Sequence, residues 1–342
     1  MRITSQMMLS HYKSDVSDAY NSMAKAMRHA FDYRAFDLPS DDPLAASQTF
    51  ETHFEMSRND DYAFNISNVK GEISSADKIL INVDSMLSNA KTLINAPDGS
   101  KNGSDRENYA NQLLDIRDAI VSRLNTQYSD SYVFSGTGSG KPPFELVKDP
   151  SGDSAKDKLY YRGIDVDTGK MKDGSTPKVS LDNLAKEKSY VDIGLGLSTD
   201  ASGNIIDQTA FNRSMPGISY IGYGKDKDGT VKNVCSLLAN IASVLKGSND
   251  QGKINQYTTA LGAQQDVLDE GQSNVGNKLN FLISTANYNS STSTSLAQKD
   301  NDVEYVDPTN AIEDFYSQKL CYNAALKVGS EVLQQSLMDY LK

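Results

Sequence analysis

A serine and two carboxylates lie between two prolines near the start of the chain, in the run PSDDP at residues 39–43. Paired carboxylates beside a hydroxyl group can bind a metal ion, act as an acid and a base, or cap a helix. Asp42 before Pro43 is typical of a cap, because proline at the first helical position lacks only an amide that has no helical partner there. Ser40 or Asp41 would take that role if the helix began at a slightly different residue. We therefore predict a capped helix start, in preference to a contact surface or a catalytic pair.

The same run also predicts a hinge. Pro39 and Pro43 disfavour the α-helical region at the residues before them, Leu38 and Asp42. A helix that arrives from the N-terminal side must therefore end before this stretch, and the next helix begins after it.

Two acidic loops resemble the start of a calcium-binding loop, Asp165–Gly169 and Asp226–Gly229. A calcium loop of this type also needs a carboxylate at its twelfth position. That position is held by Thr176 in the first loop and by Leu237 in the second. We therefore expect both loops to be turns.

The histidines and cysteines do not form a recognisable active-site pattern. His11 and His29 would lie about five turns apart on one helix, too far to share a metal ion, and His53 stands apart from both. We expect all three to be solvated helical histidines, and Cys235 and Cys321 to be two buried thiols. The sequence contains no zinc-protease, phosphate-loop, serine-hydrolase or CxxC motif. We expect no enzyme activity, no cofactor and no metal site.

The charge and hydropathy of the chain argue against nucleic acid and membrane as partners. The chain has 342 residues, with 34 basic and 45 acidic side chains and a net charge of −11, and we expect two or three domains. It shows no basic face for nucleic acid and no run of about 18 apolar residues for a membrane. The N-terminal residues show no apolar core of a signal peptide, so export would need another route.

Apolar residues at alternating spacings of three and four predict long helices with narrow seams, as in coiled coils. The first seam comprises Leu9, Tyr12, Val16, Ala19, Met23, Ala26, Ala30 and Tyr33. The second comprises Tyr62, Ile66, Val69, Ile73, Ala76, Leu80, Val83, Leu87, Ala90 and Ile94. Further helical patterns lie within 104–124, 234–245 and 254–282, and a last one follows Pro308. The polar run 289–295 is either a linker or the outer face of a continuing helix.

The middle of the chain, about 137–230, has a different composition. Glycine, aspartate, lysine, serine and threonine separate three short apolar runs, at 159–161, 191–197 and 218–223. Such runs between turn residues predict short strands.

The fold class we predict is mainly α with an inserted β-rich domain, because neither terminal seam buries enough surface to be stable alone. The N- and C-terminal regions would form a long antiparallel helical bundle, with the termini paired as a coiled coil. We expect a terminal coiled-coil domain at 1–38 and 308–342, forming an inner tube, and a helical bundle at 39–136 and 231–307. The outer β-rich domain would span 137–230.

Four stretches resemble a known family: the start MRITSQMM, the run PSDDPLAAS, the run YVFSG and the end NAALKVGSEVLQQSLMDYL. They are similar to the flagellin superfamily, and within it to the hook–filament junction proteins of the bacterial flagellum. The resemblance covers roughly 1–140 and 230–342. Filament flagellins typically lack the proline pair, which favours the junction proteins. The family commonly has glycine shortly before the hinge, where this chain reads FDYRAFDLP, so we expect its bend to be different or stiffer.

The resemblance implies a structural adaptor that joins the hook-associated zone to the filament. Its partners would be further copies of itself in a ring, the other hook-associated junction protein, flagellin, and a cytoplasmic export chaperone on the C-terminal helix. It would lie outside the cell after export through the flagellar type III apparatus. The alternatives are a flagellin-type filament subunit, or a secreted coiled-coil adhesin or type III translocator with a β binding head.

Subunit packing would be carried by apolar residues of the two terminal helices. We expect these residues to be Leu9, Tyr12, Val16, Met23, Phe315, Tyr322, Leu326, Leu333, Leu337 and Leu341. The hinge and cap residues are Pro39, Ser40, Asp41, Asp42 and Pro43.

Overall fold

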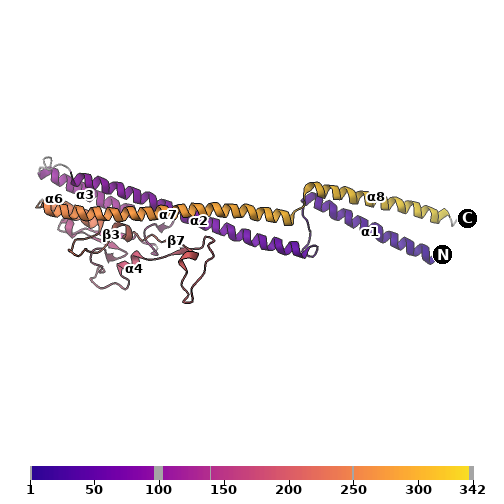
Figure 1. The fold of residues 1–342 in the computed structure, drawn as a ribbon, viewed down its shortest axis with the longest axis horizontal. Helices are drawn as coiled ribbons and strands as arrows, with labels where there is room; N and C mark the ends of the chain where they lie inside the picture. The colour runs from indigo at the N-terminus through magenta and orange to yellow at the C-terminus, as the bar shows by residue number, and fades with distance from the viewer. Residues whose placement is uncertain (1, 96–102, 139, 249, 339–342) are drawn as a thin grey trace. The chain divides into compact units, whose positions relative to one another are not determined.

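The computed structural model describes residues 2–95, 103–138, 140–248 and 250–338. The predicted fold class is confirmed, because long helices dominate both ends of the chain and short strands occupy the middle (Figure 1). The long helices are α1 (Arg2–Asp32), α2 (Pro43–Ile94), α3 (Gly103–Leu124), α6 (Val234–Lys246), α7 (Gln251–Glu304) and α8 (Pro308–Met338).

The chain divides into two compact units. Unit 1 comprises residues 1–61 and 290–342, and unit 2 comprises residues 62–289. Unit 1 therefore contains α1, α8, the start of α2 and the end of α7. Unit 2 contains the rest of α2 and α7 together with everything between them. The finer division into three domains stays a prediction.

Unit 2 is built around the apolar seam of α2. Nine of its predicted positions, from Ile66 to Ile94, are buried, and they share one core with α3, α6 and α7. Helix α6 is apolar enough to be buried along most of its length, and Asn233 caps it by accepting from the Cys235 and Ser236 amides. Gln265 on α7 donates to Asp84 on α2 at 2.6 Å, which adds a polar contact beside the core.

The strands of unit 2 are short and antiparallel. Within the described residues they form a β1–β2 pair, a β3–β4–β5 sheet and a β6–β7 pair. The bounds are β1 (Gln127–Tyr128), β2 (Ser131–Tyr132), β3 (Phe144–Val147), β4 (Lys158–Tyr161), β5 (Ile164–Asp165), β6 (Tyr190–Val191) and β7 (Phe211–Asn212). The short helices are η2 (Ser154–Lys156), α4 (Leu181–Ala185), η3 (Asp207–Thr209) and α5 (Ile218–Ile221).

The strand predicted at 218–223 is wrong, because these residues form α5 followed by a turn. Ile218, Tyr220 and Ile221 are all buried there. Gly222 follows with φ 76°, a left-handed conformation that glycine adopts easily and that ends the helix. A run that is buried on every side shows no alternation, so its periodicity does not separate strand from helix.

A buried arginine joins the helices to the β3–β4 connection. The side chain of Arg117 on α3 is 2% exposed, and its Nη1 donates to Asp157 Oδ2 at 2.6 Å. Its Nη2 donates to Asp118 Oδ1 at 2.7 Å, and Lys148 donates to the other Asp118 oxygen. Because the buried guanidinium is paired on two sides, it can remain charged within the packed unit.

The polar run 289–295 continues α7 rather than forming a linker, since α7 extends without a break to Glu304. Four glycines lie within this helix, and Gly271 has a packing reason: a Cβ there would lie 2.5 Å from Tyr220 Cδ1. Tyr220 is held in turn by an edge-on contact with Phe134. No helix in the described ranges is long and apolar enough to cross a membrane.

Two glycines of α7 give a matched pair of predictions. Gly271→Ala should lower the free energy of unfolding by about 1–3 kcal/mol, because the new methyl group meets the held Tyr220 ring. Gly276→Ala should raise it by about 0.5–1 kcal/mol, because no atom lies within 4 Å of its Cβ position and alanine favours the helix. Urea unfolding followed by circular dichroism measures both. If both substitutions changed the free energy of unfolding in the same direction, the packing role of Gly271 would be contradicted.

Candidate functional site

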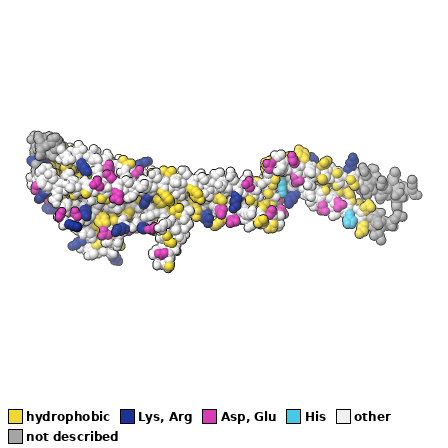
Figure 2. Space-filling view, viewed as in Figure 1, with side chains coloured by type: hydrophobic (Ala, Val, Ile, Leu, Met, Phe, Trp, Pro, Cys, Tyr) yellow, Lys and Arg dark blue, Asp and Glu magenta, His cyan; other side chains and the backbone are white. Residues whose placement is uncertain are grey.

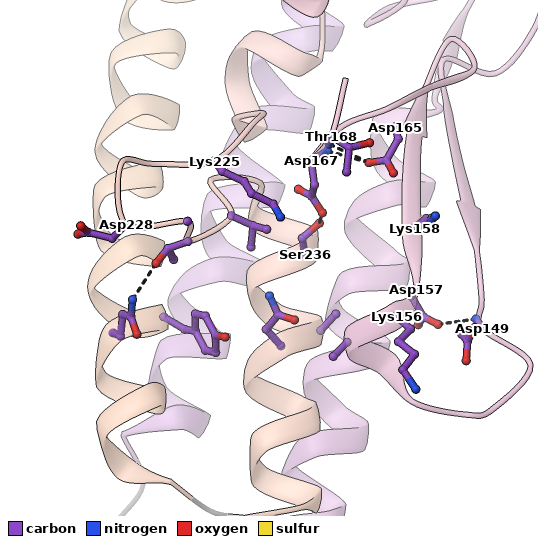
Figure 3. Close-up of a pocket in the computed structure, with 18 residues that line it drawn as sticks. Asp149, Lys156, Asp157, Lys158, Asp165, Asp167, Thr168, Lys225, Asp228 and Ser236 are labelled. Carbon is purple, nitrogen blue, oxygen red and sulfur yellow. Dashed lines mark hydrogen bonds between the residues drawn. The ribbon is translucent and has the colours of Figure 1, made fainter. Parts of the chain in front are cut away.

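The two loops that resemble calcium loops are turns, and they line one polar cavity of about 650 Å³ in unit 2 (Figure 3). Asp165 Oδ1 accepts from the amides of Asp167 and Thr168, which folds the first loop back on itself. In the second loop the Gly229 amide donates to Asp226 O at 2.9 Å. The carboxylate of Asp165 therefore serves its own turn.

Asp167 is the unusual group of this cavity. Its Oδ2 accepts from Ser236 Oγ at 2.7 Å, while burial raises the pKa of its carboxyl to about 6. Lys225 and Lys158 also line the cavity, so positive and negative charges are mixed there. Because charges of both signs line the cavity, its lining does not indicate one class of ligand.

The two cysteines differ in burial. Cys235 is 1% exposed within α6, and burial raises the pKa of its thiol to about 12. Cys321 on α8 is exposed, so the prediction of two buried thiols is wrong for this residue. Cys321 lies outside the narrow apolar seam of α8, so no neighbouring helix among the described residues covers it.

The run PSDDP caps α2. Asp42 Oδ1 accepts from the Leu44 and Ala45 amides at 3.1 and 2.9 Å, and Pro43 is the first residue of the helix. Asp41 closes the preceding turn, since its Oδ2 accepts from the Leu38 amide and its own amide donates to Leu38 O. Asp42 is thus the cap, and Asp41 shapes the turn before it.

The segment between α1 and α2 is hydrogen-bonded to the segment between α7 and α8, which also belongs to unit 1. Residues 33–35 pair with residues 304–306 in an antiparallel bridge between Arg34 and Tyr305. The Ala35 amide donates to Glu304 O and the Val306 amide donates to Tyr33 O, both at 2.8 Å. The two connections are therefore one structural element, which we call the paired linkers.

Helices α1 and α8 pair antiparallel through seams with the same spacing. The buried and half-buried positions of α1 include Tyr12, Val16, Ala19, Met23, Ala26 and Ala30, and those of α8 include Ala311, Phe315, Gln318, Tyr322, Ala325 and Gly329. Tyr12 lies against Gly329, where a Cβ would come within 1.8 Å of its hydroxyl oxygen. Tyr20 contacts Tyr322 with ring centroids 5.8 Å apart.

The predicted packing residues divide into three groups. Tyr12, Val16, Met23, Phe315 and Tyr322 lie in the seam between α1 and α8 of the same chain. Leu9 and Leu326 are 37% and 42% exposed. Leu333 and Leu337 lie on α8 beyond its described side chains, and Leu341 lies outside the described residues. Packing against neighbouring subunits stays a prediction for all of them.

The structure also shows an exposed apolar surface, most of which lies outside the predicted packing residues. We define the outer face of unit 1 as its exposed apolar side chains on α1 and α8, some of which are visible in Figure 2. They are Met7, Met8, Leu9, Tyr20, Met27, Phe31, Ile312, Tyr316, Leu320, Leu326 and Val328. Leu9 and Leu326 are among the predicted packing residues, and the others are not, because the prediction followed the seams.

Comparison with known proteins supports a flagellar relative. The chain is 29% identical over 150 residues to flagellar hook-associated protein 3 of Salmonella typhimurium, which covers 42% of this chain and 46% of that protein. It is 27% identical over 153 residues to flagellar hook-associated protein 3 of Escherichia coli, which covers 43% and 47%. The chain thus matches about half the length of these relatives, and the predicted resemblance is confirmed over that part.

A solved structure shows the same fold. The putative flagellar hook-associated protein from Vibrio parahaemolyticus matches 78% of this chain and all of that chain, with a TM-score of 0.58 and 18% identity. At that identity the likeness shows the fold alone. No protein-family model matches the chain.

The cap of α2 can be tested by two neighbouring substitutions. Asp42→Ala should lower the free energy of unfolding by about 1 kcal/mol, because the Leu44 and Ala45 amides lose their acceptor. Ser40→Ala is the control, since within the described part of the chain the Ser40 side chain makes no hydrogen bond. Urea unfolding of both variants gives the comparison. An equal loss in both would show that Asp42 is not the cap.

Proposed function

We propose that this chain is a structural subunit of the bacterial flagellum that joins the hook-associated zone to the flagellin filament. The observation that carries the proposal is the pairing of α1 with α8, which satisfies one seam within the chain and leaves a second apolar surface exposed. The similarity to flagellar hook-associated protein 3 agrees with this role. The mechanism is helical packing between subunits.

The outer face of unit 1 is the surface that would pack against neighbours. Leu320 and Phe31 on this face are 70% and 79% exposed, and apolar surface of this kind favours contact with another protein. The predicted packing residue Leu326 belongs to the same face. Tyr12, Val16, Met23, Phe315 and Tyr322 would support the interface indirectly, by keeping α1 and α8 together.

The proposed neighbours follow from this role. Further copies of the chain would form a ring, with the other hook-associated junction protein on one side and flagellin on the other. Before assembly, a cytoplasmic export chaperone would hold the C-terminal helix. The subunit would then leave the cell through the flagellar type III apparatus and act outside it.

Deletion of the gene tests the proposed role. Electron microscopy of the mutant should show hooks without filaments, and flagellin should accumulate in the medium, because the filament has no base on which to assemble. Supplying the full-length chain should restore filaments. Filaments of normal length and number in the mutant would rule out the junction role and favour the adhesin or translocator alternative.

A single charge on the outer face should block assembly without unfolding the chain. Leu320→Glu places a charge at a 70% exposed apolar position on α8, where subunit contact would bury it. We expect loss of motility with an unchanged circular dichroism spectrum. Gln298→Glu adds the same charge at an exposed polar position of α7, outside the two helices of the outer face, and should leave motility intact. Equal motility in both variants would exclude this part of the outer face from the interface.

A further inference from the structure

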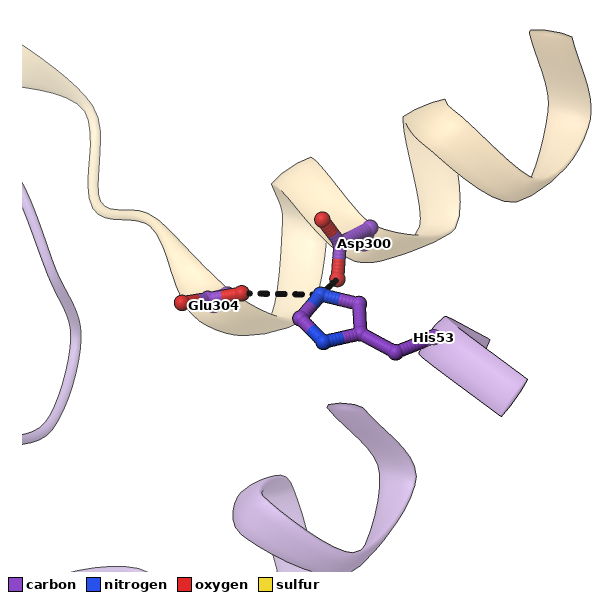
Figure 4. Close-up of side chains that lie close together, drawn as sticks. All are labelled: His53, Asp300 and Glu304. Atoms are coloured by element: carbon purple, nitrogen blue, oxygen red, sulfur yellow. Dashed lines mark ion pairs between the residues drawn. The ribbon is translucent and has the colours of Figure 1, made fainter. Parts of the chain in front are cut away.

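Three side chains of metal-ligating type converge in unit 1 beside the paired linkers (Figure 4). His53 lies on α2, and Asp300 and Glu304 lie one turn apart on one face of α7. His53 Nε2 is 2.9 Å from Asp300 Oδ1 and 3.3 Å from Glu304 Oε2. The three atoms lie within 4.8 Å of one another.

These separations match those of ligands that share one ion. Zinc binds histidine nitrogen and carboxylate oxygen at about 2.0–2.2 Å, so two ligands at angles of about 90–109° lie roughly 3.0–3.4 Å apart. Asp300 Oδ1 is also a buried atom that accepts no hydrogen bond among the described residues. Its short contact with His53 has the distance of an ion pair without the geometry of a hydrogen bond, and a cation bound to both atoms would satisfy both.

The local charge favours a cation. The side chains of Asp300 and Glu304 are 16% and 8% exposed, and burial of two neighbouring carboxylates is costly unless positive charge lies nearby. Arg34 pairs with Glu304 Oε1 at 2.8 Å, which leaves Oε2 directed at His53. Glu304 also ends α7, where the helix dipole adds partial negative charge.

We propose that His53, Asp300 and Glu304 bind one divalent transition-metal ion, for which zinc fits the ligand set best. An imidazole nitrogen with two carboxylates suits zinc, whereas magnesium and calcium prefer oxygen ligands alone. The side chain of His53 is 50% exposed, so an ion can reach the site and water can complete its coordination. The bound ion would tie α2 to the last turn of α7. The site is independent of the proposed role in assembly.

Zinc titration of the full-length chain by calorimetry at pH 7.5 tests the site. The wild type should bind one ion, and His53→Gln and Asp300→Asn should each lose at least about tenfold in affinity, because one of three ligands is removed. His11→Gln changes an exposed histidine on α1 and should bind as the wild type does. Magnesium should give no comparable binding.

Thermal unfolding provides a second measurement that does not depend on calorimetry. Zinc should raise the unfolding midpoint of the wild type and of His11→Gln, since an ion that binds only the folded state stabilises it. His53→Gln alters a half-exposed side chain, so it should keep its helical circular dichroism and lose the zinc-dependent rise. Absence of zinc binding in the wild type, or equal binding in the wild type and His53→Gln, would overturn the proposal.

Discussion

The structure depends on the narrowness of its helical seams. A stripe of apolar residues at spacings of three and four covers one side of a helix only, so a single helix cannot bury it. The seam of α1 is buried by α8, and that of α2 by α3, α6 and α7. Because α1 and α8 come from opposite ends of the sequence, the chain must return to its beginning before the terminal helices are stable.

Contacts between a tyrosine side chain and a helical glycine recur in this structure. Three helical glycines lie against a tyrosine side chain: Gly71 faces Tyr128, Gly271 faces Tyr220 and Gly329 faces Tyr12. At each glycine a Cβ would lie 1.8–2.5 Å from the nearest tyrosine atom, which a folded chain cannot accommodate without moving the ring. The chain has 18 tyrosines and no tryptophan, and at Gly71 and Gly329 it is the hydroxyl end of the tyrosine that lies against the glycine. These three glycines are therefore part of the packing, whereas Gly276 meets no neighbouring atom.

Glu304 connects several features of unit 1. Its backbone oxygen accepts from Ala35 in the paired linkers, and its carboxylate contacts both Arg34 and His53. A bend at one linker must therefore either carry the other linker with it or break these bonds. Since the outer face of unit 1 lies on the two helices that leave these linkers, Glu304 links the geometry of the proposed interface to the charge cluster at the end of α7.

The sequence by itself determined the features that depend on neighbours along the chain. The seams from Ile66 to Ile94 and from Tyr12 to Ala30, and the cap at Asp42, follow from spacing and from side-chain chemistry within one or two turns. Tertiary structure decided the rest. The first turns of α2 bury Thr49, Thr52 and Asn59 and show no apolar stripe, α5 replaces an expected strand, and Arg117 is buried. His53 meets Asp300 and Glu304 only when α2 and α7 lie side by side, because a single polar contact between distant segments, unlike a repeated apolar seam, leaves no periodic pattern in either segment.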